Sequence, residues 1–291
     1  MAQSLPGKAR PLTQYNERAM YNLTIMKKLS IAFLACLLTS IGIYAFYVEP
    51  AWLEVTTHRI GTPPVEVIKV AHLSDLHLQE IGAYETRVIA TIRQLDPDLM
   101  ILSGDVIDKP DKLPVVEEFL SKLSGKRIVA TLGNWEYWSK VDLIALRDIY
   151  TRHNVSLLVN AQETMTLKGR GIRIFGLDDF TAGSPRLNLL HAPLPTEIAI
   201  LVEHSPGFFS NSHVVRSATN PPRFQLCLSG HTHAGQVAFF GIPLWTPRGS
   251  GEFTAGLYET RYCPMYVSRG IGTSLLPVRF GARPELAVFE L

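Results

Sequence analysis

Five short apolar runs in this chain each end at a cluster of glycine and polar residues. Runs of this kind are typical of strands that are buried on both faces. Because open α/β sheets bring the carboxyl ends of their parallel strands to one edge, we expect the five clusters to meet there. The runs lie at 65–73, 99–102, 128–132, 198–202 and 224–229, and the clusters after them contain Asp75 and His77, Asp105, Asn134, His204, and His231 and His233.

The remaining segments predict a layered α/β domain with mixed sheets. Helical spacing of apolar residues marks 84–95, 115–123 and 141–153, which alternate with the first strands. Residues 241–263, rich in Gly, Pro and Thr, are expected to form a long loop of the kind that is often functional. Further strands are expected, with Gly-rich turns among them, at 155–159, 163–167, 172–177, 266–268 and 286–290.

Residues 29–48 contain no Asp, Glu, Lys or Arg. As a helix this segment spans about 30 Å, the thickness of the hydrocarbon core of a bilayer. Lys27 and Lys28 precede it, so the positive-inside rule predicts a cytoplasmic N-terminus and places the bulk of the chain on the outer side of the inner (cytoplasmic) membrane. A cleaved signal peptide and a buried core helix are the alternatives. We therefore expect a tail at 1–28, a transmembrane anchor at 29–48, a linker at 49–64 and one domain at 65–291.

Charge and cysteine content narrow the class of protein further. The formal net charge of +2, with both signs mixed along the chain, gives no signature of nucleic-acid binding. Three cysteines are too few for a disulfide framework. Cys36 lies in the apolar segment, and we expect Cys227 and Cys263 to be unpaired thiols. A bridge between these two is the alternative in an oxidising compartment.

The residue types in the five clusters suit a metal centre. Asp, Asn and His offer a mixed oxygen and nitrogen shell that suits Mn, Fe or Zn. His231 and His233 lie two residues apart on a turn and could reach two neighbouring ions, which a carboxylate could bridge. Each residue alone has an ordinary explanation as a turn residue, a helix cap or a hydrogen-bonded histidine. The ordered set of five clusters indicates a two-metal site.

The order D-x-H, G-D, G-N-x-[ED], a lone His and G-H-x-H resembles that of the calcineurin-like metallophosphoesterases. The resemblance covers residues 65–291. The anchor and three stretches resemble the membrane-associated bacterial branch of that family, the YkuE/YaeI-like phosphodiesterases. The stretches are LSDLHL at 73–78, SGHTHAGQ at 229–236 and SRGIGTS at 268–274. The resemblance implies a four-layer αββα sandwich of two mixed sheets, with both metals at strand ends.

The resemblance also implies the ligands and the reaction. One divalent ion would bind Asp75, His77, Asp105 and His233, and the second Asp105, Asn134, His204 and His231, with Asp105 as the bridge; Asp105, Asn134 and His204 would also act in catalysis. The implied reaction is hydrolysis of a phosphodiester or pyrophosphate bond. Anchoring favours a lipid-linked substrate, and related enzymes cleave UDP-2,3-diacylglucosamine in lipid A synthesis. That substrate lies on the cytoplasmic face, which conflicts with the predicted orientation.

One position departs from the family pattern. The third motif usually reads Gly-Asn-His, and that His is thought to protonate the leaving oxygen. Here the position is Trp135, whose indole N–H has no useful acidity. General acid catalysis contributes about 10²–10⁴-fold. The protein is then a weakened metal-binding scaffold or lipid-binding protein, or uses another acid (His191, His213 or Glu136), or acts on a substrate such as a diphosphate whose leaving group needs little protonation.

Other residues near the motifs have two interpretations each. Tyr137 and Trp138 either pack against the sheet or form a lip for an acyl chain or a base. Asp178 and Asp179 are expected to structure a loop and not to bind metal. Three arginines are expected on the surface by default and could alternatively hold a phosphate by bidentate hydrogen bonds: Arg248, Arg269 and Arg279. Arg269 is the preferred candidate for phosphate because it follows a predicted strand.

Overall fold

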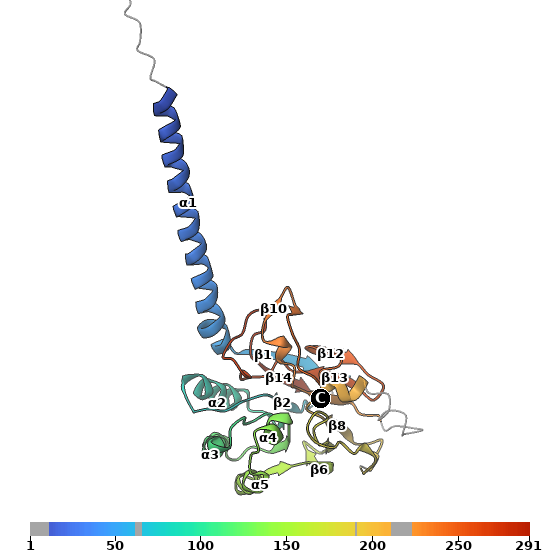
Figure 1. Cartoon of the computed structure of the whole chain (residues 1–291). Coiled ribbons are helices and arrows are strands. Elements are labelled where there is room, and N and C mark those ends of the chain that lie inside the picture. Colours follow the sequence, from blue (N-terminus) through green and yellow to red (C-terminus); the bar gives the residue numbers. More distant parts are fainter. Residues whose placement is uncertain (1–11, 62–65, 190, 211–222) are drawn as a thin grey trace, which may run out of the picture. The chain divides into compact units, whose positions relative to one another are not determined.

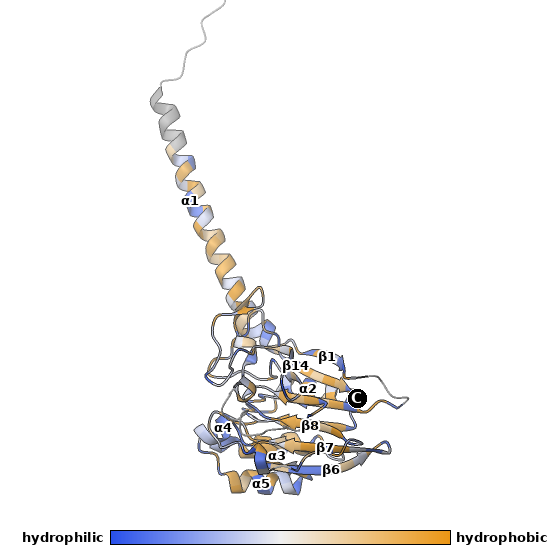
Figure 2. Ribbon diagram, turned by 90° about the vertical axis from the view of Figure 1, so that its right-hand side faces the viewer, coloured by the Kyte–Doolittle hydropathy of each residue, from blue (hydrophilic) through white to orange (hydrophobic). Residues whose placement is uncertain are grey.

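The uncharged segment lies within a long helix of the structure, a computed structural model that describes residues 12–61, 66–189, 191–210 and 223–291 (Figure 1). Helix α1 (Leu12–Ile43) belongs to the N-terminal unit of the chain and is mostly apolar (Figure 2). A π-helical turn (Tyr44–Val48) follows it. Among the described residues, Met20–Ala51 is the one helical stretch long and apolar enough to cross a membrane, and it contains the expected anchor.

The second unit of the chain, Phe46–Leu291, contains two mixed six-stranded sheets. The strands of the first sheet are β1 (Glu54–Arg59), β2 (Lys69–Leu73), β3 (Leu99–Ser103), β4 (Ile128–Thr131), β5 (Val155–Leu157) and β14 (Glu285–Glu290). Those of the second are β6 (Ala161–Leu167), β7 (Arg170–Gly176), β8 (Ile198–Val202), β9 (Leu226–Ser229), β12 (Gly256–Glu259) and β13 (Pro264–Val267). The spatial orders are β1-β14-β2-β3-β4-β5 and β12-β13-β9-β8-β7-β6.

Apolar side chains hold the layers together. Helices α2 (Ala83–Leu95), α3 (Leu113–Ser121) and α5 (Leu143–Arg152) cover the outer face of the first sheet through one apolar cluster (Figure 1). A second cluster, which includes Ile101 and Ile200, lies between the two sheets. The expected sandwich of two mixed sheets is confirmed. A third apolar cluster lies on the other face of the second sheet, where the described residues include the 3₁₀ turn Pro206–Ser210.

The topology brings the five predicted clusters together. β2, β3 and β4 run parallel within the first sheet, and β8 and β9 run parallel within the second. The strands of the first set end at Leu73, Ser103 and Thr131, and those of the second at Val202 and Ser229. Each cluster begins directly after one of these ends, so the polar side chains meet where the edges of the two sheets face each other.

The predicted linker at 49–64 is wrong over part of its length. Residues 54–59 form β1, which pairs in parallel with β14 at the edge of the first sheet. Positions along β1 alternate between half-buried and exposed, so the strand contains no apolar run that would predict it. The strand that pairs with it, β14, lies at the far end of the chain. The loop expected at 241–263 is also interrupted, because β12 pairs antiparallel with β13.

The cysteine prediction is wrong as well, because Cys227 and Cys263 form a disulfide with Cα atoms 5.9 Å apart. β13 lies beside β9 and places Met265 opposite Cys227, which brings Cys263 within bonding range. The free cysteine in the described part of the chain, Cys36, is exposed on α1. Disulfides persist in oxidising compartments and are rare in a reducing cytoplasm.

Reducing this disulfide is expected to lower the free energy of unfolding by about 3–4 kcal/mol, because the bond closes a loop of 36 residues. Thermal unfolding of the detergent-solubilised chain, with and without a thiol reductant, measures the effect. The variant Cys36→Ser is the control and should unfold like the unmodified protein. An equal melting temperature in both conditions would contradict the prediction.

Candidate metal centre

Most of the predicted ligands have an unusual backbone conformation. Left-handed backbone costs an ordinary residue about 1–2 kcal/mol, and such strain collects at functional sites. The surrounding structure must therefore hold these residues in place. The predicted ligands with positive φ are Asp75 (54°), His77 (44°), Asp105 (51°), His231 (69°) and His233 (50°).

Two glycines allow the ligand loops to approach one another. A Cβ atom at Gly133 would lie 2.6 Å from the backbone nitrogen of Asp105 and would also collide with its carboxylate. A Cβ atom at Gly230 would collide with Ser74 and with the carboxylate of Asp75. Any larger residue at either position would push the two strand ends apart. The glycines of these two motifs are thus required by close packing around the carboxylates.

The first group of converging ligands is Asp75, His77 and His233. Nε2 of His233 lies 3.3 Å from Oδ1 of Asp75 and 3.2 Å from Nε2 of His77. All three residues are buried, and their ligand atoms lie within 4.8 Å of one another. Two imidazole nitrogens that face each other at this distance, beside a carboxylate, form a donor set that suits a cation between them.

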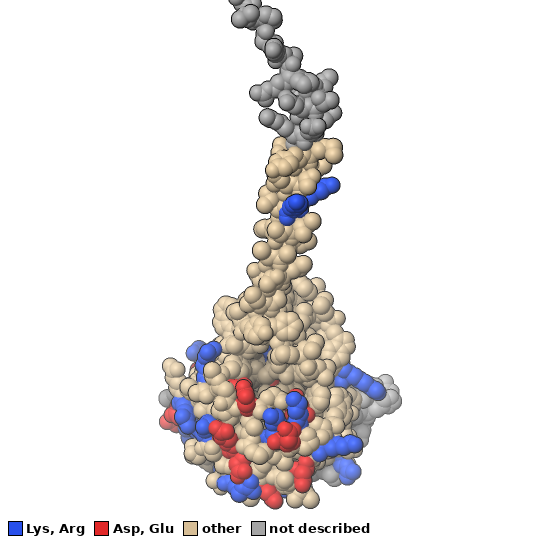
Figure 3. Space-filling model, turned by 60° about the vertical axis from the view of Figure 1, so that its left-hand side comes forward, with Lys and Arg blue, Asp and Glu red and all other residues tan. Residues whose placement is uncertain are grey.

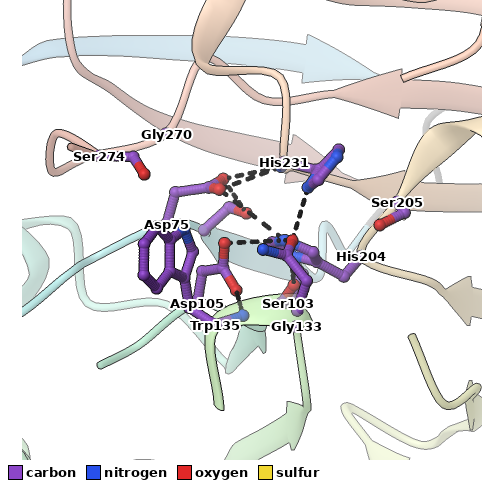
Figure 4. A network of polar contacts seen from close by, with 12 residues as sticks. Asp75, Ser103, Asp105, Gly133, Trp135, His204, Ser205, His231, Gly270 and Ser274 are labelled. Atoms are coloured by element: carbon purple, nitrogen blue, oxygen red, sulfur yellow. Dashed lines mark hydrogen bonds and ion pairs between the residues drawn. The ribbon is translucent and has the colours of Figure 1, made fainter. Parts of the chain in front are cut away.

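The second group is Asp105, His204 and His231, with Asn134 beside them. Nε2 of His204 lies 3.1 Å from Oδ2 of Asp105 and 3.2 Å from Oδ1 of Asn134. Oδ1 of Asn134 is also 2.6 Å from Nδ1 of His231. Asp105 lies between the two groups, since its Oδ2 is 3.9 Å from Nε2 of His77. The structure thus brings all seven predicted ligands together, with Asp105 between the two groups. Figure 4 shows Asp75, Asp105, His204 and His231 of this set.

Backbone carbonyls set the tautomers of two histidines. Nδ1 of His204 donates to the carbonyl oxygen of Ser103 at 2.7 Å, and Nε2 of His231 donates to that of Arg248 at 2.9 Å. The other ring nitrogen of each histidine, Nε2 of His204 and Nδ1 of His231, faces the ligand group and is the one that could bind a metal. Such outer hydrogen bonds commonly orient metal-binding histidines.

The carboxylates and histidines of the group shift one another's pKa. Burial alone would lower the pKa of His204, but Asp105 and Asp75 raise it well above its usual value. Burial also opposes the rise in the pKa of His77, which Asp108 and Asp105 produce. Burial alone would raise the pKa of Asp75, but His233 holds it well below the usual range. The pKa of Asp105 is likewise lowered by His204 against the effect of burial. Burial lowers the pKa of His233 to about 4, so its ring is neutral at physiological pH. In addition, Nδ1 of His77 is buried without a hydrogen-bond partner, 3.6 Å from Asp108. Anionic carboxylates and neutral imidazoles are the forms that bind metal.

Trp135 lies at the edge of this group (Figure 4). Its backbone N–H donates to Oδ1 of Asp105 at 2.8 Å. Its ring meets those of His77 and Trp138 edge to face, with centroids 6.1 and 5.9 Å apart. The indole therefore borders the ligands at the position where the family pattern has a histidine, and it joins Trp138 in an aromatic wall.

Two of the three residues that could replace the missing acid, Glu136 and His191, lie in the described part of the chain. Neither lines the cavity that opens beside the ligands. Glu136 is buried and accepts backbone N–H bonds from Asp105, Val106 and Gly133, which fixes the loop around the ligands. Burial raises the pKa of Glu136 to about 7. His191 is exposed, with its backbone N–H bonded to the side chain of Gln162 on β6. The third candidate, His213, lies outside the described residues.

A cavity of roughly 350 Å³ opens beside the ligands. Among the described residues that line it, Asp105, His231 and His233 are the only titratable ones, and all three belong to the ligand group. Its walls are otherwise apolar or neutral. The apolar side chains that line it are Trp135, Trp138, Val237, Leu244, Trp245, Pro247, Leu275, Leu276 and Val278.

The arginine prediction is wrong for its preferred residue. Arg269 donates to the carboxylates of Glu54 and Glu285 at 2.8 and 3.2 Å, and so ties β1 to β14. Arg279 is fully buried and donates to several backbone carbonyls, and its Nη2 lies 3.3 Å from Nδ1 of His233. Arg248 contributes its carbonyl oxygen to His231.

The carboxylates of Asp178 and Asp179 accept hydrogen bonds from their own loop, as expected.

Several contacts at the site were not predicted from the sequence. They are made by the side chain of Asp108 beside His77, by the carbonyl groups of Ser103 and Arg248, and by the cavity residues in 237–247 and 274–278. Backbone carbonyls leave no signature in residue type. Asp108 lies three residues after Asp105, and this spacing is the one signal that pointed to it.

Known proteins share this sequence pattern. A profile of the calcineurin-like phosphoesterase family matches residues 68–235. The uncharacterized metallophosphoesterase YkuE of Bacillus subtilis is 33% identical over 264 residues, which cover 85% of this chain and 88% of that protein. An uncharacterized metallophosphoesterase of Aquifex aeolicus is 28% identical over 284 residues, or 89% and 98% of the two chains. A bovine transmembrane protein with a metallophosphoesterase domain is 27% identical over 256 residues, or 80% of this chain and 55% of that protein. The chain belongs to the calcineurin-like phosphoesterase family.

Proposed function

We propose that this protein is a membrane-anchored hydrolase that uses two divalent ions to cleave phosphodiester or pyrophosphate bonds in lipid-linked substrates. The observation that carries the proposal is the position of the ligand group at one side of an apolar cavity. Trp135, Trp245 and Leu276 are among the residues that line this cavity, and no Lys or Arg belongs to the described lining. Such walls favour the hydrocarbon part of a substrate over a second charged group.

The seven side chains have distinct parts in this proposal. Two ions of Mn, Fe or Zn, if bound at the site, would supply an activated water and would offset the negative charge of the phosphoryl group. Asp105 and Asn134 line the cavity and so face the phosphoryl group, whereas His204 is fully buried behind them. The proposed ligands are Asp75, His77, Asp105 and His233 for one ion, and Asp105, Asn134, His204 and His231 for the other.

Trp135 favours a substrate with a good leaving group. Glu136 is occupied by backbone N–H groups, and the lining described above contains no titratable group outside the ligand set. A leaving alkoxide would gain nothing here from general acid catalysis, whereas a phosphate monoester leaves readily as an anion. This reasoning supports pyrophosphate bonds, as in UDP-2,3-diacylglucosamine, and activated diesters over alkyl phosphomonoesters.

The side of the membrane on which the catalytic domain lies decides which lipid substrates it can meet. The charge pattern around residues 29–48 and the Cys227–Cys263 disulfide both favour a catalytic domain outside the cytoplasm of a single-pass inner-membrane protein. On that side a lipid phosphodiester or a lipid diphosphate is the better candidate than a nucleotide-linked lipid, which is made on the cytoplasmic face. A C-terminal alkaline phosphatase fusion, active only outside the cytoplasm, tests this orientation.

A catalytically weakened scaffold or lipid-binding protein is the alternative, and Trp135 is the observation that favours it. The strained backbone at five predicted ligands favours the hydrolase, since it keeps a complete ligand set in place at a cost in stability.

The test is an assay of the full chain in detergent micelles with Mn²⁺. We expect a diphosphate-linked lipid or an activated lipid diester to be cleaved at least about 10²-fold faster than an alkyl phosphomonoester, because the alkyl ester needs the missing acid. Equal rates for all substrates would contradict the leaving-group proposal. Bound metal without hydrolysis of any substrate would support the scaffold instead.

A further inference from the structure

An exposed apolar surface borders the cavity. We call it the apolar rim and define it by Phe239, Phe240, Ile242, Leu244, Trp245, Leu275 and Leu276. The hairpin of β10 (Ala238–Phe239) and β11 (Ile242–Pro243) carries part of it. Phe240 at the hairpin tip is fully exposed, and Ile242 and Leu275 are 71% and 75% exposed. Residues 236–247 and 270–278 contain no charged side chain. Exposed apolar patches of this kind mark interaction sites.

The rim is held firmly by the second unit of the chain. The backbone N–H of Ala238 donates to the carbonyl of Phe280 at 2.7 Å, and that of Phe280 donates to Gln236 at 2.8 Å. The rings of Phe239 and Phe280 pack with centroids 5.2 Å apart. The 274–278 segment is tied to the hairpin base, since the N–H of Ser274 donates to the side chain of Gln236. The rim residues are therefore exposed on an ordered support.

The residues after Phe280, which supports the hairpin, also bind the chain at the point where the apolar segment ends. Glu49, the residue directly after segment 29–48, is buried, and its carboxylate accepts the N–H groups of Gly281 and Ala282 at 3.0 and 2.7 Å. Gly281 follows Phe280, which holds the hairpin. If segment 29–48 spans a bilayer, residue 49 lies at the membrane surface. The rim is attached within a few residues of that point.

The distribution of charged side chains agrees with contact between a membrane and the end of the second unit that carries β10. On the face seen in Figure 3, acidic and basic side chains are interspersed over the end away from β10. The end at which β10 lies in Figure 1 carries few of them. A surface that faced water on all sides would show mixed charges throughout.

We propose that the apolar rim inserts into the interfacial layer of the bilayer that holds the anchor. Phe240 and Ile242 enter the lipid, while Leu244, Trp245, Leu275 and Leu276 both belong to the rim and line the cavity. The mouth of the cavity then opens to the bilayer, and an acyl chain reaches the ligand group without crossing water. The insertion rests on the anchoring part of the proposed function and not on the hydrolysis; the path of the acyl chain rests on both.

Depth-dependent fluorescence quenching of the full chain in phosphatidylcholine nanodiscs tests the insertion. In a Cys36→Ser background, Phe240→Cys is labelled with an environment-sensitive fluorophore. We expect a blue-shifted emission that lipids with shallow spin labels quench. Ile144→Cys is the matched control, because Ile144 is 75% exposed on α5, far from the rim in sequence, and its label should remain in water. Equal emission and equal quenching at the two positions would overturn the proposal.

A second pair of variants separates insertion from catalysis. Neither Phe240 nor Ile242 lines the cavity. Phe240→Glu with Ile242→Glu should therefore leave hydrolysis of soluble bis-p-nitrophenyl phosphate unchanged and lower hydrolysis of lipid substrate in nanodiscs by about tenfold or more. Ile144→Glu should change neither. Quenching at residue 240 in a protein that cleaves nothing would retain the insertion and reject the hydrolase, whereas full lipid hydrolysis by the double variant would reject the insertion.

Discussion

Replacing Asp105 with asparagine is expected to lower metal-dependent hydrolysis of bis-p-nitrophenyl phosphate by about 10³-fold or more, the scale of losing one essential electrostatic group. The carboxylate of Asp105 lies between the two ligand groups, 3.1 Å from His204 and 3.9 Å from His77. Asparagine keeps the shape and still accepts the N–H of Trp135, so the loop should stay folded. What is lost is the negative charge that both proposed ions share.

Metal content measured by elemental analysis should fall together with the rate. Asp142→Asn is the control, because Asp142 is exposed and its carboxylate caps α5 away from the site. Unchanged hydrolysis by Asp105→Asn would show that the reaction does not use this ligand group. Two ions bound per wild-type chain, with no hydrolysis under any metal, would favour the scaffold.

Replacing Trp135 with histidine is expected to raise hydrolysis of alkyl phosphodiesters by about 10²–10⁴-fold and to change that of aryl diesters and diphosphates little. The imidazole would supply the acid that the family pattern has at this position, beside Asp105 and in the lining of the cavity. Only substrates with poor leaving groups need that proton. The comparison therefore tests why the chain tolerates an indole here.

Trp135→Phe is the matched control for this substitution. It removes the indole but adds no acid, so the ratio of alkyl to aryl rates should stay as in the wild type. A uniform gain for all substrates in Trp135→His would mean that the indole limits access to the site, and the leaving-group explanation would be wrong.

The features that the sequence predicts correctly are those whose evidence lies in residues that are neighbours along the chain. Local apolar runs marked the strands that precede Asp75, Asp105 and His204, and parallel pairing then placed the clusters at one edge. The strands in the interior of the domain and the set of converging side chains could be predicted from these local signals. The catalytic and ligand roles stay predictions, and the experiments above address them.

Features that depend on partners distant in the chain could not be predicted. β1 has no apolar run of its own and forms only because β14 lies beside it. Cys227 meets Cys263 because β13 pairs with β9. Arg269 was expected to bind phosphate, but Glu54 and Glu285 approach it from opposite ends of the chain. In each case the residue type was visible, and the neighbour that decides its role was not.

The attachment of Glu49 to Gly281 and Ala282 has a kinetic consequence. If segment 29–48 spans the bilayer, a hydrolase domain fixed to Glu49 would meet lipids by lateral diffusion in two dimensions and not by collision from bulk solution. Its turnover should then follow the mole fraction of substrate in the bilayer. Diluting the substrate with inert lipid would slow the enzyme, while adding buffer to the same proteoliposomes would leave the rate per enzyme unchanged.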